Sequence, residues 1–274
     1  MRVQSVLFLG LLATGCTGAS VDEPMERAPN AETPALTAAE LSESSERVAL
    51  VPSPVETQRA LESAGIETQL SGLIQDRDFD TRNENPDNAA VRTGVIIADM
   101  LLTVKTSSKE DLLRHLDQLE QGMTQLDGGR DILAMLDEIK DRVRADAVTR
   151  DELLQELDEL SGAFIPELEF NGRERIVPLI QAGSWLEGAN LLSRAVKEAD
   201  QPETADELLK QPSVVAYFLE YVQKEGADKA PEAVTQKLES SLVTLEGIAK
   251  KSEPLTMDDV DVVITTTNDV LALL

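Results

Sequence analysis

The sequence contains very little cysteine, histidine and aromatic residue. It has one cysteine (Cys16) and one histidine (His115) in 274 residues, and aromatic residues make up 3% of the chain. A single cysteine excludes an intramolecular disulfide, and a single histidine excludes a histidine cluster for zinc. So few aromatic side chains argue against stacking platforms for bases or sugar rings. Aliphatic packing must therefore stabilise the fold.

Basic residues are also scarce. Lys and Arg total 25 against 51 Asp and Glu, which gives a net charge of -26. A chain with this charge repels nucleic acid and anionic lipid head groups, so we predict no nucleic-acid partner and expect any charged partner to be a basic protein or peptide. Hydrophobic residues still make up 42% of the chain. The acidity is therefore that of a solvated surface over a real core.

The motifs of the commonest enzyme classes are missing. The sequence has no Gly-x-Ser-x-Gly, no P-loop, no dinucleotide-binding glycine pattern and no His-Glu-x-x-His. We predict no cofactor. A non-enzymatic binding or structural protein is the main interpretation, and an enzyme is the alternative.

The N-terminus carries the most specific signal in the chain. Arg2 is followed by an apolar run over residues 6–12 and by three small residues directly before Cys16. A charged start, an apolar core of about 7 to 15 residues and a small-residue processing site are the parts of a secretory signal peptide. Their order resembles the lipobox of bacterial lipoproteins, which implies that residues 1–15 are removed and Cys16 is acylated. The alternative is an ordinary signal peptide with a chance cysteine.

Acylation of Cys16 implies a location on a membrane. Each CH₂ group of an acyl chain that is buried in the bilayer contributes about 0.8 kcal/mol to membrane affinity, so two or three chains on this one residue can hold a domain on the membrane. The longest later apolar stretch, residues 95–104, is about half of the roughly 20 residues that span a bilayer. Thr17 is not the aspartate that favours inner-membrane retention in enterobacterial lipoproteins, so the resemblance implies the outer membrane. We expect a cell-envelope lipoprotein whose membrane contact is its acyl chains.

The rest of the chain divides into a tether and one helical domain. Residues 16–51 are acidic and contain three prolines, which predicts a disordered tether. Residues 52–274 are predicted to form a single all-α domain of about nine antiparallel helices, as a bundle or as stacked pairs. Apolar residues recur at spacings of three and four over three segments joined by short connections: 112–126, 132–143 and 153–164.

Local signals predict how several helices begin and end. Capping boxes are expected where Ser or Thr precedes an acidic residue by three positions, at Ser53, Thr149 and Thr256. Residues 89–104 are apolar on almost every face and predict a helix in the centre of the fold. We expect Pro178 to kink a long helix over residues 173–199. The last segment, residues 260–274, is rich in β-branched residues, so a strand remains possible there.

Two acidic residues fall on apolar helix faces. Asp99 lies inside the apolar segment 95–102, and Glu187 shares a polar stripe with Gly183, Asn190 and Arg194. A buried carboxylate must be paired or protonated. We therefore predict a buried polar network, with glycines that let two helix backbones approach closely, formed by Arg92, Asp99, Glu187, Asn190 and Arg194. Two functions stay open: an ionic network without chemistry, or an acid and base pair formed by Asp99 and Glu187.

Three elements carry a second resemblance. They are Pro52-Ser53-Pro54 with Glu56, the Gly-x-x-x-Ala-Asp element that ends at Asp99, and the Gly-Ser-Trp-Leu-Glu-Gly element that ends at Gly188. In this order they are similar to elements of uncharacterised all-helical lipoproteins of Bacteroidetes-type bacteria. The resemblance implies a helical fold and an envelope location, and it implies no activity.

One acidic loop and one histidine complete the candidates. Asp76, Asp78 and Asp80 are spaced as in the first half of an EF-hand calcium loop, but Thr81 replaces its glycine and the bidentate glutamate is missing. These three are weak metal-ligand candidates beside the alternative of an acidic loop that caps the next helix. His115 is expected to flank an apolar seam.

Overall fold

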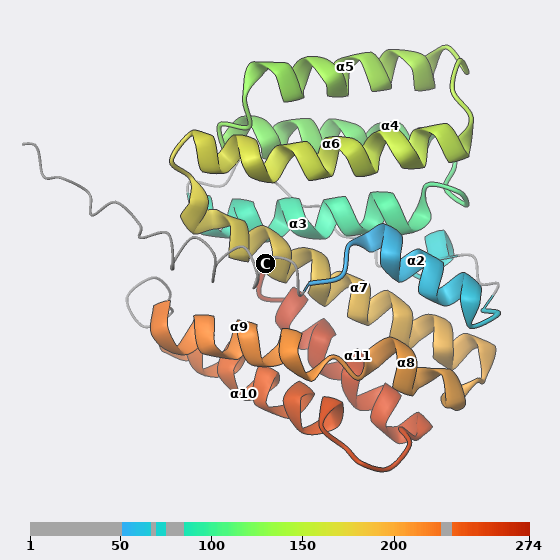
Figure 1. Cartoon of the computed structure of the whole chain (residues 1–274), viewed down its shortest axis with the longest axis vertical. Coiled ribbons are helices and arrows are strands. Elements are labelled where there is room, and N and C mark those ends of the chain that lie inside the picture. The colour runs from blue at the N-terminus through green and yellow to red at the C-terminus, as the bar shows by residue number, and fades with distance from the viewer. Residues whose placement is uncertain (1–50, 67–69, 75–84, 226–231) are drawn as a thin grey trace, which may run out of the picture.

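The computed structural model describes residues 51–66, 70–74, 85–225 and 232–274. Within these residues the chain forms ten α-helices and no strand (Figure 1), which confirms the all-α class with one helix more than the predicted nine. The helices are α2 (Pro54–Ser63), α3 (Pro86–Thr103), α4 (Lys109–Gln125), α5 (Arg130–Arg144), α6 (Arg150–Phe170), α7 (Val177–Ala199), α8 (Ala205–Leu209), α9 (Pro212–Glu225), α10 (Glu232–Ala249) and α11 (Met257–Leu271).

The three predicted capping boxes are confirmed. In each box the cap hydroxyl accepts a hydrogen bond from the backbone N–H three residues later, and the acidic side chain there accepts one from the cap backbone. They open α2, α6 and α11 at Ser53, Thr149 and Thr256. The last of these shows that residues 257–271 are helical. The β-branched residues of α11 take part in tertiary packing, which overrides their local preference for strand.

The helices form three layers. In Figure 1, α4, α5 and α6 lie on one side, α3 and α7 cross the middle, and α8 to α11 lie on the other side, with α2 beside α3 and α7. Two apolar clusters fill the spaces between the layers. Helix α3 contributes to both, because Ile96, Met100 and Leu101 belong to one cluster and Val95, Ala98 and Leu102 to the other. This explains why its sequence is apolar on almost every face.

Helices α3 and α7 run in the same direction and cross at two glycines. Arg175, just ahead of α7, donates two hydrogen bonds to Asp87 in the first turn of α3, so both helices begin at the same end of the molecule. A Cβ atom on Gly94 would lie 1.9 Å from the carbonyl oxygen of Ile180, and one on Gly183 would lie 2.0 Å from that of Val91. The predicted close approach at Gly183 is confirmed.

The outer layer follows the predicted periodicity. The apolar residues of α4, α5 and α6 at spacings of three and four are buried, among them Leu116, Leu136 and Leu157, each at 0% exposure. Lys140 of α5 is 5% exposed and pairs with Asp117 of α4 at 2.7 Å and with Glu120 at 2.5 Å. Burial lowers the pKa of Lys140, but the hydrogen bonds with these two carboxylates outweigh burial and leave it raised. The α4–α5 pair is therefore joined by a charged contact at its edge.

The expected kink at Pro178 was wrong. Residues 174–176 form a separate 3₁₀ turn, and α7 begins at Val177, so Pro178 stands in the first helical turn. Its missing N–H there leaves no intrahelical hydrogen bond unmade. Another 3₁₀ turn, Leu70–Gly72, lies in the chain between α2 and α3.

Candidate functional site

The two candidate carboxylates lie deep in the fold. Asp99 of α3 is 5% exposed, and Glu187 of α7 is completely buried. Both belong to the α3–α7 pair that crosses at Gly94 and Gly183, and neither is among the described residues that line the apolar cavity beside α7. An acid and base pair needs contact with a substrate, so this burial favours the structural interpretation of the two carboxylates over the catalytic one.

Part of the predicted polar network has contacts that the sequence did not reveal. Arg194 donates a hydrogen bond to the Oδ1 atom of Asn190 at 2.9 Å, as expected from their spacing on α7. Asn190 itself donates to α11, to Thr267 Oγ1 at 2.8 Å and to Asn268 Oδ1 at 2.9 Å. Thr267 and Asn268 interrupt the apolar pattern of α11. This interruption is the one feature of the sequence that could have indicated them as partners of a buried polar residue. The inclusion of Arg92, Asp99 and Glu187 in the same network stays a prediction.

The remaining sequence candidates fall outside the part of the chain that the structure describes. Cys16 and the acidic loop residues Asp76, Asp78 and Asp80 belong to this group. Among the described residues, no cluster of three or more His, Cys, Asp or Glu side chains could hold a metal ion. No helix in the described ranges is both long and apolar enough to cross a membrane.

The expectation that His115 flanks the apolar seam was wrong. The side chain is buried, with 4% exposed, and its Nδ1 atom has no hydrogen-bond partner within the described ranges. Burial, together with the nearby charge of Arg114, lowers the pKa of His115 to about 4, although Asp111 opposes the shift. His115 is therefore a neutral core residue near pH 7.

His115 should make the folded state sensitive to acid. Its ordinary pKa of 6.5 applies to the unfolded chain, so between pH 6.5 and about 4 the unfolded state binds a proton that the folded state excludes. The free energy of unfolding should fall with decreasing pH by up to about 1.4 kcal/mol per pH unit from this residue alone. Urea denaturation of wild type and His115→Leu across this range measures the difference. Carboxylates titrate in both proteins, and parallel pH profiles would contradict the assignment to His115.

A large apolar cavity lies between α7 and the helices α9, α10 and α11. It has a volume of about 320 Å³ and is bounded by the start of α3, the first half of α7, the second half of α9, much of α10 and the end of α11. Its inner wall consists of apolar side chains that include Leu179, Trp185, Phe218, Leu238, Leu242 and Val270. Small-molecule sites in proteins are typically apolar and of about 300 to 1,000 Å³. The cavity therefore has the size and surface of a small ligand site.

The cavity explains a difference along α10. Val234, Leu238, Leu242 and Leu245 recur on α10 at spacings of three and four, and all four line the cavity. Leu242 and Leu245 are buried, whereas Val234 and Leu238 are only half-buried. These two side chains face a space that protein atoms do not fill. Such incomplete packing is unusual, because protein interiors are normally close-packed.

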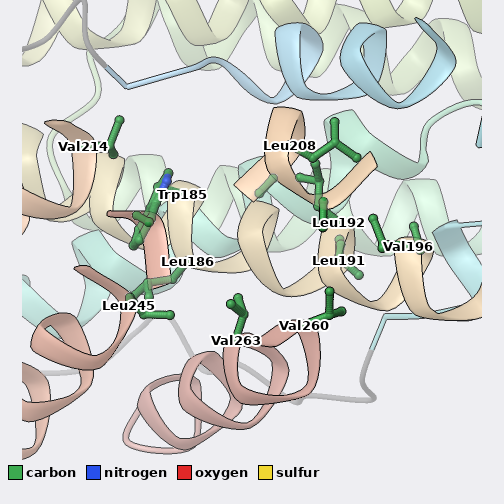
Figure 2. Close-up of a cluster of buried hydrophobic side chains, with 14 of the residues drawn as sticks. Trp185, Leu186, Leu191, Leu192, Val196, Leu208, Val214, Leu245, Val260 and Val263 are labelled. Atoms are coloured by element: carbon green, nitrogen blue, oxygen red, sulfur yellow. The ribbon is translucent and has the colours of Figure 1, made fainter. Parts of the chain in front are cut away.

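Aromatic residues stand at the inner end of the cavity. Trp185 of α7 packs against Phe218 of α9 with a ring-centroid distance of 5.4 Å, and its indole N–H donates to the Oε1 atom of Gln211 at 2.9 Å. Figure 2 shows Trp185, Leu186 and Leu245 on one side of the apolar cluster between α7 and α8 to α11. Leu208 of α8 and Val260 of α11 lie on the other side. Trp185 is the only tryptophan of the chain and therefore a specific optical reporter for this cavity.

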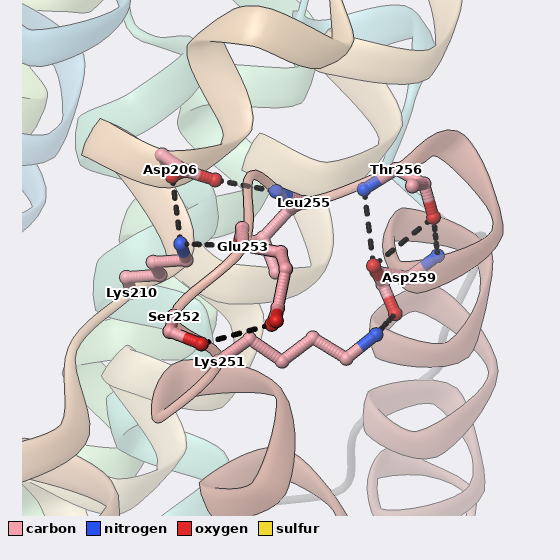
Figure 3. A network of polar contacts seen from close by, with 8 residues as sticks. All are labelled: Asp206, Lys210, Lys251, Ser252, Glu253, Leu255, Thr256 and Asp259. Carbon is pink, nitrogen blue, oxygen red and sulfur yellow. Dashed lines mark hydrogen bonds and ion pairs between the residues drawn. The ribbon is translucent and has the colours of Figure 1, made fainter.

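Helices α9 and α10 form a hairpin, and a polar network holds the end of it where α9 begins and α10 ends. The two pack chiefly on each other. Figure 3 shows how the end away from the cavity is held: Lys210 donates to Asp206 at 2.7 Å and to the backbone oxygen of Glu253 at 2.8 Å, and the N–H of Leu255 donates to Asp206 at 2.6 Å. The hydrogen bond from Lys210, followed by that from Leu255, holds the pKa of Asp206 below its usual range.

Comparisons with protein-family models, with curated proteins and with solved structures find no match to this chain. The geometry of the cavity and of the buried carboxylates is therefore the basis for assigning a function.

Proposed function

We propose that this protein is a lipid-anchored carrier or sensor of the cell envelope, rather than an enzyme, whose helical domain binds a small apolar molecule. The observation that carries the binding function is the apolar cavity of about 320 Å³ beneath the α9–α10 hairpin. The lipobox resemblance at Cys16 supports the anchor, and we place the protein at the outer membrane on the same resemblance. The net charge of -26 keeps the domain soluble and suits a basic partner in the envelope.

The enzyme alternative has less support. Its two candidate carboxylates, Asp99 and Glu187, are 5% and 0% exposed, and the cavity is lined by residues of the neighbouring face of α7. Asp87 is the only charged side chain among the described residues that line the cavity, and it is bound by Arg175. A wall of this kind can hold an apolar molecule, but it offers no pair of groups that could transfer protons to it.

The anchor predicts a simple change of location. Replacing Cys16 by serine should move the protein from the membrane fraction to the soluble fraction and abolish labelling by radioactive fatty acid, because the acyl chains supply the membrane affinity. Fractionation of cells followed by immunoblotting measures this. Thr14→Ala keeps a small residue before the cysteine and should leave the location unchanged. A Cys16→Ser protein that stays on the membrane and carries label would contradict the anchor.

The binding function predicts saturable uptake of a neutral apolar probe. The mature chain with Cys16→Ser should bind N-phenyl-1-naphthylamine, with energy transfer from Trp185 to the bound probe, because Trp185 lines the cavity. Ala182→Phe places a ring in the cavity and should weaken binding at least about tenfold, a loss of about 1.4 kcal/mol. Both effects are measured by fluorescence titration.

The matched control is an equal substitution on the surface. Ala134 of α5 is exposed and lies in the outer layer, so Ala134→Phe adds the same aromatic area without reaching the cavity. This variant should bind the probe as wild type does. Equal binding by the Ala182→Phe and Ala134→Phe proteins would show that the probe binds elsewhere and would remove the support for the proposed function.

A further inference from the structure

We propose that the natural ligand of the cavity is an uncharged amphiphile with a single acyl chain, of the monoacylglycerol type. This inference rests on the proposed binding function and adds the chemical class of the ligand. It follows from three properties of the described cavity wall: its volume, its lack of cationic side chains and the position of its polar groups.

The volume fits one hydrocarbon chain. The cavity of about 320 Å³ lies at the small end of the range for ligand sites, about 300 to 1,000 Å³, and this suits the methylene groups of one hydrocarbon chain. The wall that would contact them is built from aliphatic and aromatic side chains of five helices. A compact polar ligand would leave the apolar wall unpaired and would lose its own hydration.

The charges of the wall exclude an ionised head group. The described lining residues include no Lys, Arg or His, so a carboxylate or phosphate would find no cation there and would meet the overall negative charge of the protein. The one charged lining residue is Asp87, in the first turn of α3. Arg175 donates to both of its carboxylate oxygens, at 3.2 and 2.7 Å. A cationic head group would therefore have to compete with Arg175.

The start of α3 does not offer an anion site either. Its N-cap residue Asn85 already accepts a hydrogen bond from the N–H of Asp87 at 2.9 Å. The carboxylate of Asp87 supplies the negative charge that a helix N-terminus favours. An added anion would face this carboxylate at close range. The positive end of the helix is thus already compensated by residues of the chain itself.

Uncharged polar groups gather at the same end of the cavity. Asn85 and Asn88 come from α3 and its cap, Tyr221 from α9 and Thr235 from α10. Asn85 is exposed and the other three are half-buried, so they form a rim between the apolar wall and the solvent. The Tyr221 hydroxyl donates to the backbone oxygen of Arg175, and the Asn85 side chain accepts from Asp87. Amides and hydroxyls nevertheless have further donor or acceptor positions that match the hydroxyl groups of a glycerol head. A chain in the cavity would place such a head group at this rim.

A displacement series tests the head group at constant chain length. Monolaurin, laurate and dodecyltrimethylammonium carry matched chains with a neutral, an anionic and a cationic head. Below their micelle concentrations at pH 7, monolaurin should displace N-phenyl-1-naphthylamine from the mature Cys16→Ser chain at a concentration at least about tenfold lower than either ion. Equal or better displacement by laurate or by the cation would overturn the proposed class. Failure of the probe itself to bind would overturn the proposed function instead, so the two failures are distinguishable.

A charge placed at the rim should change this preference. Thr235→Lys provides the cation that the described wall lacks, and laurate should then displace the probe within a few-fold of the concentration needed for monolaurin. Thr235→Met adds a side chain of similar length without charge and should keep the wild-type ranking. If the Thr235→Lys protein still bound laurate much more weakly than monolaurin, the rim would not select the ligand by its head group, and this would contradict the inference.

Discussion

Replacing Gly183 by alanine should lower the free energy of unfolding by about 3 kcal/mol or more. The added Cβ atom would lie 2.0 Å from the carbonyl oxygen of Val91, which is backbone and cannot rotate away. Helices α3 and α7 would have to separate along the crossing that joins the two apolar clusters. Gly94→Ala should act in the same way, because its Cβ atom would lie 1.9 Å from the carbonyl oxygen of Ile180. Urea denaturation followed by circular dichroism measures both effects.

The matched control lies on the same helix. Gly188 is also buried in α7, but a Cβ atom added to it would meet no neighbour within 4 Å. Gly188→Ala should therefore stabilise the protein by up to about 1 kcal/mol, the difference in helix propensity between the two residues. A small effect at Gly183, comparable with that at Gly188, would contradict the close crossing of α3 and α7.

Replacing Asn190 by alanine should lower the free energy of unfolding by about 3 kcal/mol. Asn190 is fully buried and joins α7 to α11 through hydrogen bonds to Thr267 and Asn268. Its removal leaves the side chains of Arg194 and Asn268 without the partner that they share in the interior. The loss should appear in the midpoint of urea denaturation with an unchanged slope.

Ser193 provides the control for Asn190. It is equally buried on α7, but its hydroxyl donates only to the carbonyl oxygen of Ala189 within the same helix, at 2.7 Å. Ser193→Ala should change the stability by less than about 1 kcal/mol. A double-mutant cycle of Asn190→Ala with Asn268→Ala should give a coupling energy of at least about 1 kcal/mol. Additive effects of these two substitutions would contradict a direct contact between α7 and α11.

Features that depend on neighbouring residues in the sequence could be predicted well. The spacing of three and four predicted the buried faces of α4 to α6, and the Ser or Thr caps predicted the starts of α2, α6 and α11. The central position of α3 followed from its apolar composition, because a helix between two cores has no face for polar residues. The role of Gly183 followed from its place in a polar stripe on an apolar helix.

Features that depend on which helices meet could not be predicted. The partners of Asn190 come from α11, which lies more than seventy residues further along the chain. His115 differs from the leucines of its seam only in polarity, and its burial depends on how closely α4 packs against its neighbours. The cavity is formed by what five helices leave unfilled, and no single segment contains its signal. One wall of it is the α9–α10 hairpin, whose end away from the cavity is held by the polar network of Figure 3.

The binding function of the cavity is tested most directly by locating the bound apolar probe. Nuclear Overhauser effects between N-phenyl-1-naphthylamine and the methyl groups of the mature Cys16→Ser chain report which side chains it contacts. If the probe binds in the cavity, we expect contacts with the methyl groups of Leu242, Leu245 and Val270, which line it. Contacts confined to exposed methyl groups, such as those of Val243 and Val262, would show surface adsorption and would contradict a binding function for this cavity.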